Sequence, residues 1–249
     1  MELAGEVVAL LVLVAFVAGT VDAVAGGGGL LVVPALLLAG LPPVAALATN
    51  KVQAAWGSGG ATLAYARAGR VRPLAQWWPA LLAALGAGVG ALLAARLPVA
   101  ALEAAIPAVL VGVALYFGLQ PRLSDQDRAP RLSQRAFDLA VPPAVGLYDG
   151  LLGPGAGSFY MLGFVGLRGH GLLKATAHTK LLNFASNLGS LLVFALVAEP
   201  LWLLGLLMGL AQLLGAQVGA RLALRVGARV IRPLIVAVSL LLALRLLLF

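Results

Sequence analysis

The sequence predicts an all-α integral membrane protein built from two inverted-topology repeats of about five helical segments each. Hydrophobic residues make up 62% of the chain and charged residues only 10%, whereas a soluble domain carries about 25% charged residues. Several apolar stretches reach or approach the roughly 18 residues that a spanning helix needs. An aspartate, a glycine cluster and a lysine also recur in the same order in both halves of the chain. We expect 8–10 membrane segments, with a short or broken pair in each repeat.

The first repeat is placed at residues 1–119. Its apolar segments are predicted, in order, at about residues 7–24, 30–39, 43–65, 74–95 and 102–119. The second is too short to span comfortably, and four glycines precede it. The first segment resembles a cleavable signal, but a signal peptide begins with basic residues and this chain has Glu2 and Glu6. We therefore expect the first segment to be retained.

A hydrophilic linker at residues 120–135 separates the first repeat from the second, which is placed at residues 136–249. The linker contains charged residues and two prolines, which is typical of a loop. The second repeat has the same order of segments, predicted at about residues 137–152, 158–167, 172–197, 202–224 and 231–249. Its second segment is again short and follows a glycine cluster.

The two halves match at a nearly constant offset, which is the signature of an internal repeat. Gly19, Asp22, Gly26 and Gly28 correspond to Gly146, Asp149, Gly153 and Gly155 at an offset of 127 residues. Other matched positions lie at 129 or 126: Lys51 with Lys180, Gly86-Ala87-Gly88-Val89-Gly90 with Gly215-Ala216-Gln217-Val218-Gly219, Arg96 with Arg225, and Pro107 with Pro233. The glycines of Gly86–Gly90 and of Gly205–Gly219 are typical of closely packed membrane helices.

Basic residues indicate that the two repeats are inserted in opposite orientations. Positively charged connectors face the cytoplasm. In the first repeat they lie between the third and fourth segments, whereas in the second they follow the fourth. This assignment puts the connector at residues 67–72, the linker, Arg168, Lys174 and the connector at residues 221–232 on the cytoplasmic side. It holds whether each short pair spans the membrane twice or returns as a re-entrant hairpin, so that alternative stays open.

The glycine clusters predict broken helices rather than packed ones. Four glycines in a row, or Gly-Pro-Gly-Ala-Gly, interrupt a helix. Each cluster precedes a short segment, so a helix N-terminus with its free N–H groups would point at the break, where it favours an anion. Short, interrupted segments at matching places in two halves indicate a transporter's substrate site.

Ionisable and amide side chains accompany both breaks. Lys51 and Lys180 lie within long apolar segments, where a charge is costly and usually kept for function, although a lysine that snorkels to the interface is the alternative. Asp22 and Asp149 are expected to pair with these lysines or to carry a coupled proton. Lys180 shares one helix face with two asparagines at spacings of three and four, whereas His178 is expected to be a packed or interfacial residue.

The sequence contains no motif typical of cofactor binding, metal binding or catalysis. The chain has no cysteine, no phosphate loop and no metal-ligand spacing, so we expect no cofactor, no metal and no enzymatic activity. The net charge of +8 is assigned to anionic lipid rather than to nucleic acid.

The doubled motifs resemble the sulfite exporter TauE/SafE family, also called the TSUP family. The residues that carry the resemblance are Gly19-x-x-Asp22-x-x-x-Gly26-Gly27-Gly28-Gly29, Ala48-Thr49-Asn50-Lys51, Gly150-x-x-Gly153-Pro154-Gly155-x-Gly157-Ser158 and Lys180-Leu181-Leu182-Asn183-x-x-Ser186-Asn187. The resemblance covers essentially the whole chain. It implies a small permease for sulfur-containing anions such as sulfite or organosulfonates, without an ATPase subunit.

The function expected from these observations is secondary transport of such an anion across the cytoplasmic membrane, with proton coupling left open. An anion channel and a non-transporting membrane scaffold are the alternatives. The expected partners are a small anionic substrate and the lipid bilayer, with a homodimer also left open. The expected substrate-binding residues are Gly26, Gly27, Gly28, Gly29, Asn50, Lys51, Gly153, Gly155, Gly157, Ser158, Lys180, Asn183 and Asn187.

Overall fold

A computed structural model describes residues 3–102, 104–106, 108 and 125–227, and within these ranges the regular structure is entirely helical. The elements are α1 (Gly5–Ala25), α2 (Gly28–Leu38), α3 (Pro43–Arg67), the 3-10 turn η1 (Pro73–Gln76), α4 (Trp77–Arg96), α6 (Gln134–Leu151), α7 (Ala156–Gly166), α8 (Leu172–Val197) and α9 (Trp202–Val226). Most of the predicted segment 102–119, all of segment 231–249 and the match of Pro107 with Pro233 lie outside the described residues.

Four stretches among the described residues are long and apolar enough to cross a membrane: Gly5–Ala25, Pro73–Arg96, Leu172–Val197 and Trp202–Val226. Large apolar side chains cover the outside of these helices, and Leu192, Leu196 and Leu203 are each at least 70% exposed. Several polar side chains, including Lys51 and Lys180, are by contrast buried within the bundle. The prediction of an all-α membrane protein is therefore confirmed.

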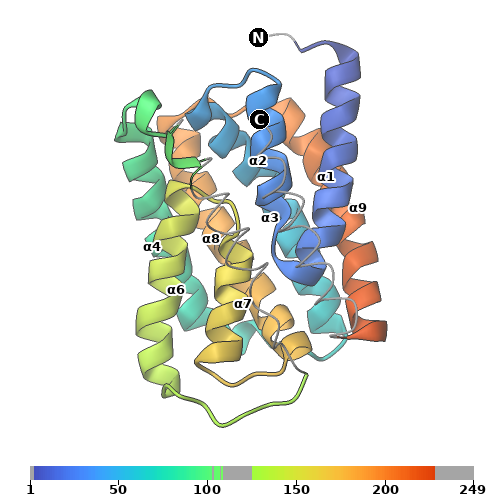
Figure 1. Cartoon of the computed structure of the whole chain (residues 1–249), viewed down its shortest axis with the longest axis vertical. Coiled ribbons are helices and arrows are strands. Elements are labelled where there is room, and N and C mark those ends of the chain that lie inside the picture. The colour runs from blue at the N-terminus through green and yellow to red at the C-terminus, as the bar shows by residue number, and fades with distance from the viewer. Residues whose placement is uncertain (1–2, 103, 107, 109–124, 228–249) are drawn as a thin grey trace.

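The two short helices each form a hairpin with the helix before them. α2 and α7 contain 11 residues each. At 1.5 Å per residue they are about 16 Å long, half the roughly 30 Å of a hydrocarbon core. In Figure 1, α2 runs back alongside α1 toward the upper end, and α7 runs back alongside α6 toward the lower end. The two hairpins therefore open toward opposite ends of the molecule.

Each half of the chain is completed by a long helix from the other half. α9 packs against α1 and α3, whereas α4 packs against α6 and α8. Glycines make these contacts close. A Cβ on Gly90 of α4 would lie 2.1 Å from the Leu147 carbonyl oxygen, and one on Gly219 of α9 would lie 2.2 Å from that of Thr20. The predicted packing role of these glycines is confirmed.

These close contacts occur at equivalent positions of the two repeats. Gly86 of α4 contacts Pro143 of α6, and Gly215 of α9 contacts Phe16 of α1. The two glycines are 129 residues apart in sequence and their two partners are 127 residues apart, which are the offsets found between the repeats. The two-copy pattern of the sequence is thus present in the packing of the described helices. Inversion of the two copies across a bilayer, and the division at residues 119 and 136, stay predictions.

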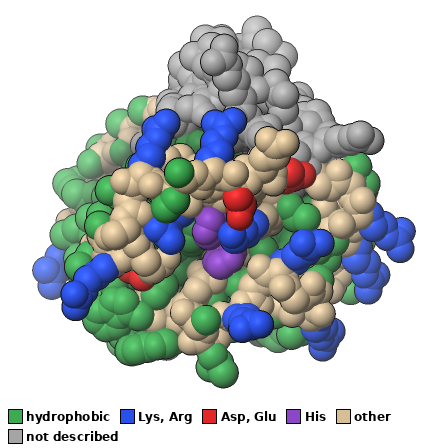
Figure 2. Space-filling view, turned by 90° about the horizontal axis from the view of Figure 1, so that it is seen from below, with side chains coloured by type: hydrophobic (Ala, Val, Ile, Leu, Met, Phe, Trp, Pro, Cys, Tyr) green, Lys and Arg blue, Asp and Glu red, His purple; other side chains and the backbone are tan. Residues whose placement is uncertain are grey.

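The basic connectors lie together at one end of the molecule. The end of α3, the loop before α6, the α7–α8 loop and the end of α9 all lie at the lower end in Figure 1. Figure 2 shows this end, with Lys and Arg side chains distributed around it and histidines near its centre. This is the grouping expected of a single cytoplasmic face.

Candidate functional site at the two glycine breaks

Left-handed glycines form both helix breaks. Gly26 follows α1 with a φ of 81°, and Gly153 follows α6 with a φ of 88°. These two residues are equivalent by the repeat offset of 127. A left-handed backbone favours glycine, because any side chain there is strained. The glycine clusters therefore end α1 and α6 as predicted, and they allow α2 and α7 to start in a new direction.

The tips of the two hairpins are in direct contact. A Cβ on Gly26 would lie 2.5 Å from the carbonyl carbon of Gly157, and one on Gly157 would lie 2.7 Å from the Gly26 carbonyl oxygen. The Ser158 hydroxyl donates to the Ala25 carbonyl across the same junction at 2.9 Å. The breaks, which are more than 120 residues apart in sequence, therefore form one structure.

Two buried ion pairs cross this junction. Lys51 Nζ of α3 lies 2.6 Å from Asp149 Oδ1 at the end of α6, and Lys180 Nζ of α8 lies 3.0 Å from Asp22 Oδ2 at the end of α1. Each pair joins one repeat to the other. All four side chains are at most 7% exposed, so neither lysine snorkels to the surface. Their formal charges cancel within the site.

Further hydrogen bonds fix the carboxylates. Asp22 Oδ1 accepts from the N–H of Gly28 at 3.2 Å, so this side chain occupies the anion-favouring N-terminus of α2. Asp149 Oδ2 accepts from the Ser186 hydroxyl, and Lys51 also donates to the Asp149 main-chain carbonyl at 2.7 Å. Lys180 likewise donates to the Asp22 main-chain carbonyl, so each lysine is held by a carboxylate and by the same residue's backbone.

A small cavity of about 20 Å³ lies between the tips and the long helices. A volume of this size accommodates a single water-sized group. Its lining comprises Asp22, Gly26, Gly29, Asn50, Ala54, Asp149, Gly153, Gly155, Ala156, Gly157, Asn183, Asn187 and Gln212. The structure thus brings most of the predicted site residues to one point.

Five predicted site residues do not line the cavity. Each lysine pairs with an aspartate that lines the cavity, and the hydroxyl of Ser158 joins the two tips. Gly27 and Gly28 form the start of α2. Their expected contact with substrate requires a conformation in which the pairs or the tips open, so their binding role stays a prediction.

Sequence reasoning missed Gln212. This residue belongs to α9, whose match to the other half is the glycine pattern at Gly215–Gly219, and its repeat equivalent in α4 is Ala83. The available signal was an amide inside a long apolar segment, which is costly in a membrane unless the side chain faces the bundle interior. Gln212 is 2% exposed and lines the cavity beside Asn183 and Asn187.

The histidines lie apart from the cavity. His178 packs against Phe164 and His170, with ring centroids 5.4 Å and 4.9 Å away, as expected of a packed residue. Burial lowers the pKa of His170, in the loop before α8, to about 4, and the nearby charge of Lys174 acts in the same direction. His170 is therefore neutral at physiological pH.

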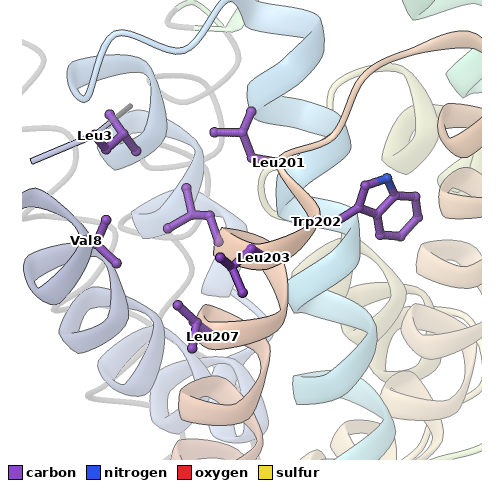
Figure 3. A pocket seen from close by; sticks show the side chains of 7 residues that line it. Leu3, Val8, Leu201, Trp202, Leu203 and Leu207 are labelled. Carbon is purple, nitrogen blue, oxygen red and sulfur yellow. The ribbon is translucent and has the colours of Figure 1, made fainter. Parts of the chain in front are cut away.

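An apolar groove of about 330 Å³ lies between the starts of α1 and α9, away from the glycine breaks (Figure 3). Its lining is Leu3, Val8, Leu201, Trp202, Leu203, Leu204 and Leu207. This surface offers no charged side chain to an anion, and its chemistry matches that of a lipid acyl chain.

Comparisons with known proteins agree on a membrane transporter. The family model of the sulfite exporter TauE/SafE matches residues 11–246. A probable membrane transporter protein, ORF9, from Sinorhizobium sp. is 53% identical over 99% of this chain and 94% of its own length. The probable membrane transporter protein YfcA of Escherichia coli K12 is 44% identical over 96% of this chain and 88% of its own. A probable membrane transporter protein of Haemophilus influenzae is 40% identical over 96% of this chain and 94% of its own length. No solved structure matches the chain significantly.

Proposed function

Because this chain belongs to the sulfite exporter TauE/SafE family of membrane transporters, we propose that it is a secondary transporter of small sulfur-containing anions. Sulfite and organosulfonates are the proposed cargo, and the cytoplasmic membrane is the proposed location. The observation that carries the proposal is the pair of crossed, buried lysine–aspartate contacts where two broken helices meet. No other place among the described residues combines buried cations with helix N-termini.

The proposed binding step begins from a site whose charges are balanced. An entering anion adds negative charge, and in a buried site this charge must be compensated. Protonation of Asp22 or Asp149 would weaken its hold on a lysine and leave that ammonium for the anion. Asp22 would also release the Gly28 N–H at the N-terminus of α2. This exchange couples anion binding to a proton without any additional residue.

Asn50, Asn183 and Asn187 are the residues proposed to hydrogen-bond the oxygens of the bound anion. All three line the cavity. Asn187 Nδ2 donates to the Asn183 main-chain carbonyl at 2.8 Å, and Asn50 Oδ1 accepts from Gln53 Nε2 at 2.8 Å. The Asn50 amide nitrogen, which carries two N–H groups, can therefore act as a donor to the anion.

The cavity size supports alternating access over a permanently open pore. A volume of about 20 Å³ is too small for a multi-atom oxyanion, so binding requires the hairpins or long helices to move. α1–α2 and α6–α7 enter from opposite ends, and withdrawal of one hairpin would open the cavity toward one end only. A channel would instead need both hairpins to withdraw together.

The test is anion flux into proteoliposomes that contain the purified protein. We expect saturable sulfite or sulfonate flux that a proton gradient can drive uphill, and we expect Lys51→Ala and Lys180→Ala each to abolish it. Lys174→Ala is the matched control, because this third lysine forms an exposed pair with Asp127 outside the site. Undiminished flux in both site variants would refute the proposed site, and flux that neither saturates nor runs uphill would identify a channel.

A further inference from the structure

Gln212 occupies a notch between two helices of the first repeat. A Cβ on Gly19 of α1 would lie 2.8 Å from Gln212 Cγ, and one on Gly57 of α3 would lie 2.6 Å from Gln212 Cδ. Only glycine at these two positions leaves room for the glutamine side chain. The packing of α1, α3 and α9 therefore places this amide at the cavity and restricts where it can turn.

The amide of Gln212 is buried without a protein partner for its oxygen. Oε1 has no hydrogen-bond partner among the described residues, although the side chain is only 2% exposed. Leaving a buried polar atom unpaired destabilises the folded state. Gln53 and Thr179 also have buried unpaired oxygens, but neither residue lines the cavity. Of these three residues, Gln212 alone both has an unpaired oxygen and lines the cavity.

The repeat allows Gln212 to be compared with the residue at the equivalent position of the other half. Gly146 meets Ala83 of α4 as Gly19 meets Gln212 of α9, so the fold accepts alanine at the equivalent position. The packing of the fourth helix against the first helix of the other half therefore does not demand an amide. A polar side chain on one of two equivalent positions, facing a cavity, indicates a role in the site rather than in the scaffold.

We propose that Gln212 is a substrate-contacting residue that donates an amide hydrogen bond to the transported oxyanion. The inference rests on the proposed function and extends it to a third long helix, α9. A half-turn of the amide about its Cγ–Cδ bond exchanges Oε1 and Nε2 within the same space, so the nitrogen can be presented to the ligand. α9 then contacts substrate directly, and its packing on α1 and α3 links occupancy of the site to both helices.

The inference is tested by anion binding to the purified protein in detergent, with sulfite, thiosulfate and sulfoacetate as probes. A ligand that binds only the folded state raises the unfolding temperature. Gln212→Met keeps a linear side chain of similar volume and removes the amide. We expect its unfolding temperature without ligand to be unchanged or raised, and its Kd for the best probe to rise about 10- to 100-fold.

Gln212→Glu is a second variant with a different signature. Its carboxylate would repel the anion at pH 8, and binding should partly return toward pH 5 as the group takes up a proton. Gln217→Ala is the matched control on the same helix, because Gln217 Nε2 donates to the Gly60 carbonyl at 2.8 Å and does not line the cavity. We expect this control to lower the unfolding temperature and leave Kd unchanged.

Three results separate the inference from the proposed function. Weaker binding in Gln212→Met with normal binding in the control supports the inference. Wild-type Kd values in both Gln212 variants would mean that the amide serves only water or packing, and would overturn the inference alone. A wild-type protein that binds none of the three anions would overturn the proposed function and this inference with it.

Discussion

The crossed ion pairs allow a quantitative prediction for stability. At the 2.6 Å between Lys51 Nζ and Asp149 Oδ1, with an effective dielectric constant of about 20, the attraction is roughly 6 kcal/mol. At the 3.0 Å between Lys180 Nζ and Asp22 Oδ2 it is roughly 5.5 kcal/mol. Desolvation of the buried charges offsets most of this attraction. Removal of one partner, however, leaves an uncompensated buried charge and costs about 3–5 kcal/mol.

Single and double substitutions of the four paired residues therefore test this cost. Lys51→Met and Asp149→Asn are each expected to lower the free energy of unfolding by about 3–5 kcal/mol, whereas the double variant should lie within about 1 kcal/mol of wild type. Lys180→Met and Asp22→Asn should behave in the same way. Reversible unfolding in mixed micelles at pH 7 measures the free energy of unfolding of the six variants and the wild type.

Mismatched doubles test the pairing itself. Lys51→Met with Asp22→Asn leaves both remaining partners, Asp149 and Lys180, without a counter-charge. Its loss of stability should approach the sum of the two single losses. Recovery in this mismatched double, with none in the matched doubles, would show that each lysine pairs within its own repeat and would refute the crossed arrangement.

Other predictions concern the tips and the end of the molecule that carries the basic connectors. Gly26→Ala should destabilise the protein far more than Gly40→Ala, as measured by unfolding temperature, because both glycines have a positive φ but only Gly26 meets backbone within 4 Å. Equal losses would refute the tip contact. As pH falls from about 6.5 to about 4, the unfolded chain gains a proton that folded His170 does not, so stability should fall, and less steeply in His170→Gln. An unchanged slope would contradict the burial of His170. Lys174→Ala should cost less than about 1 kcal/mol, because its pair with Asp127 is exposed; a loss comparable to that of Lys51→Met would contradict this.

Much of the site could be predicted because its residue types are out of place in a membrane. Gly26, Asp22 and Lys51 interrupt apolar sequence, and their repetition at a fixed offset predicts that both copies matter. The lengths of α2 and α7 follow from the glycines and from the connectors that bound them. Structure was needed to show that each short helix folds back along the helix before it. Whether each pair is re-entrant or crosses the membrane twice stays open, because charge parity is the same for both.

The lysine–aspartate pairs and the full set of cavity-lining residues could not be predicted in the same way. The sequence does not indicate which aspartate each lysine contacts, since both repeats contain one of each. The crossed pairs arise because the tips overlap, so that the end of α1 reaches α8 and the end of α6 reaches α3. The contact of Gln212 with the cavity could not be predicted, because it depends on the space that Gly19 of α1 and Gly57 of α3 leave for this side chain.

In the proposed mechanism the two halves build one shared anion site rather than one site each. The decisive experiment is isothermal titration of the purified wild-type protein, Lys51→Ala and Lys180→Ala with the tightest binder among sulfite, sulfate, thiosulfate, taurine and sulfoacetate. We predict a stoichiometry of one anion per chain in the wild type, and loss of that binding in either variant. Two anions per chain, or one anion still bound after a single lysine is removed, would contradict a shared site.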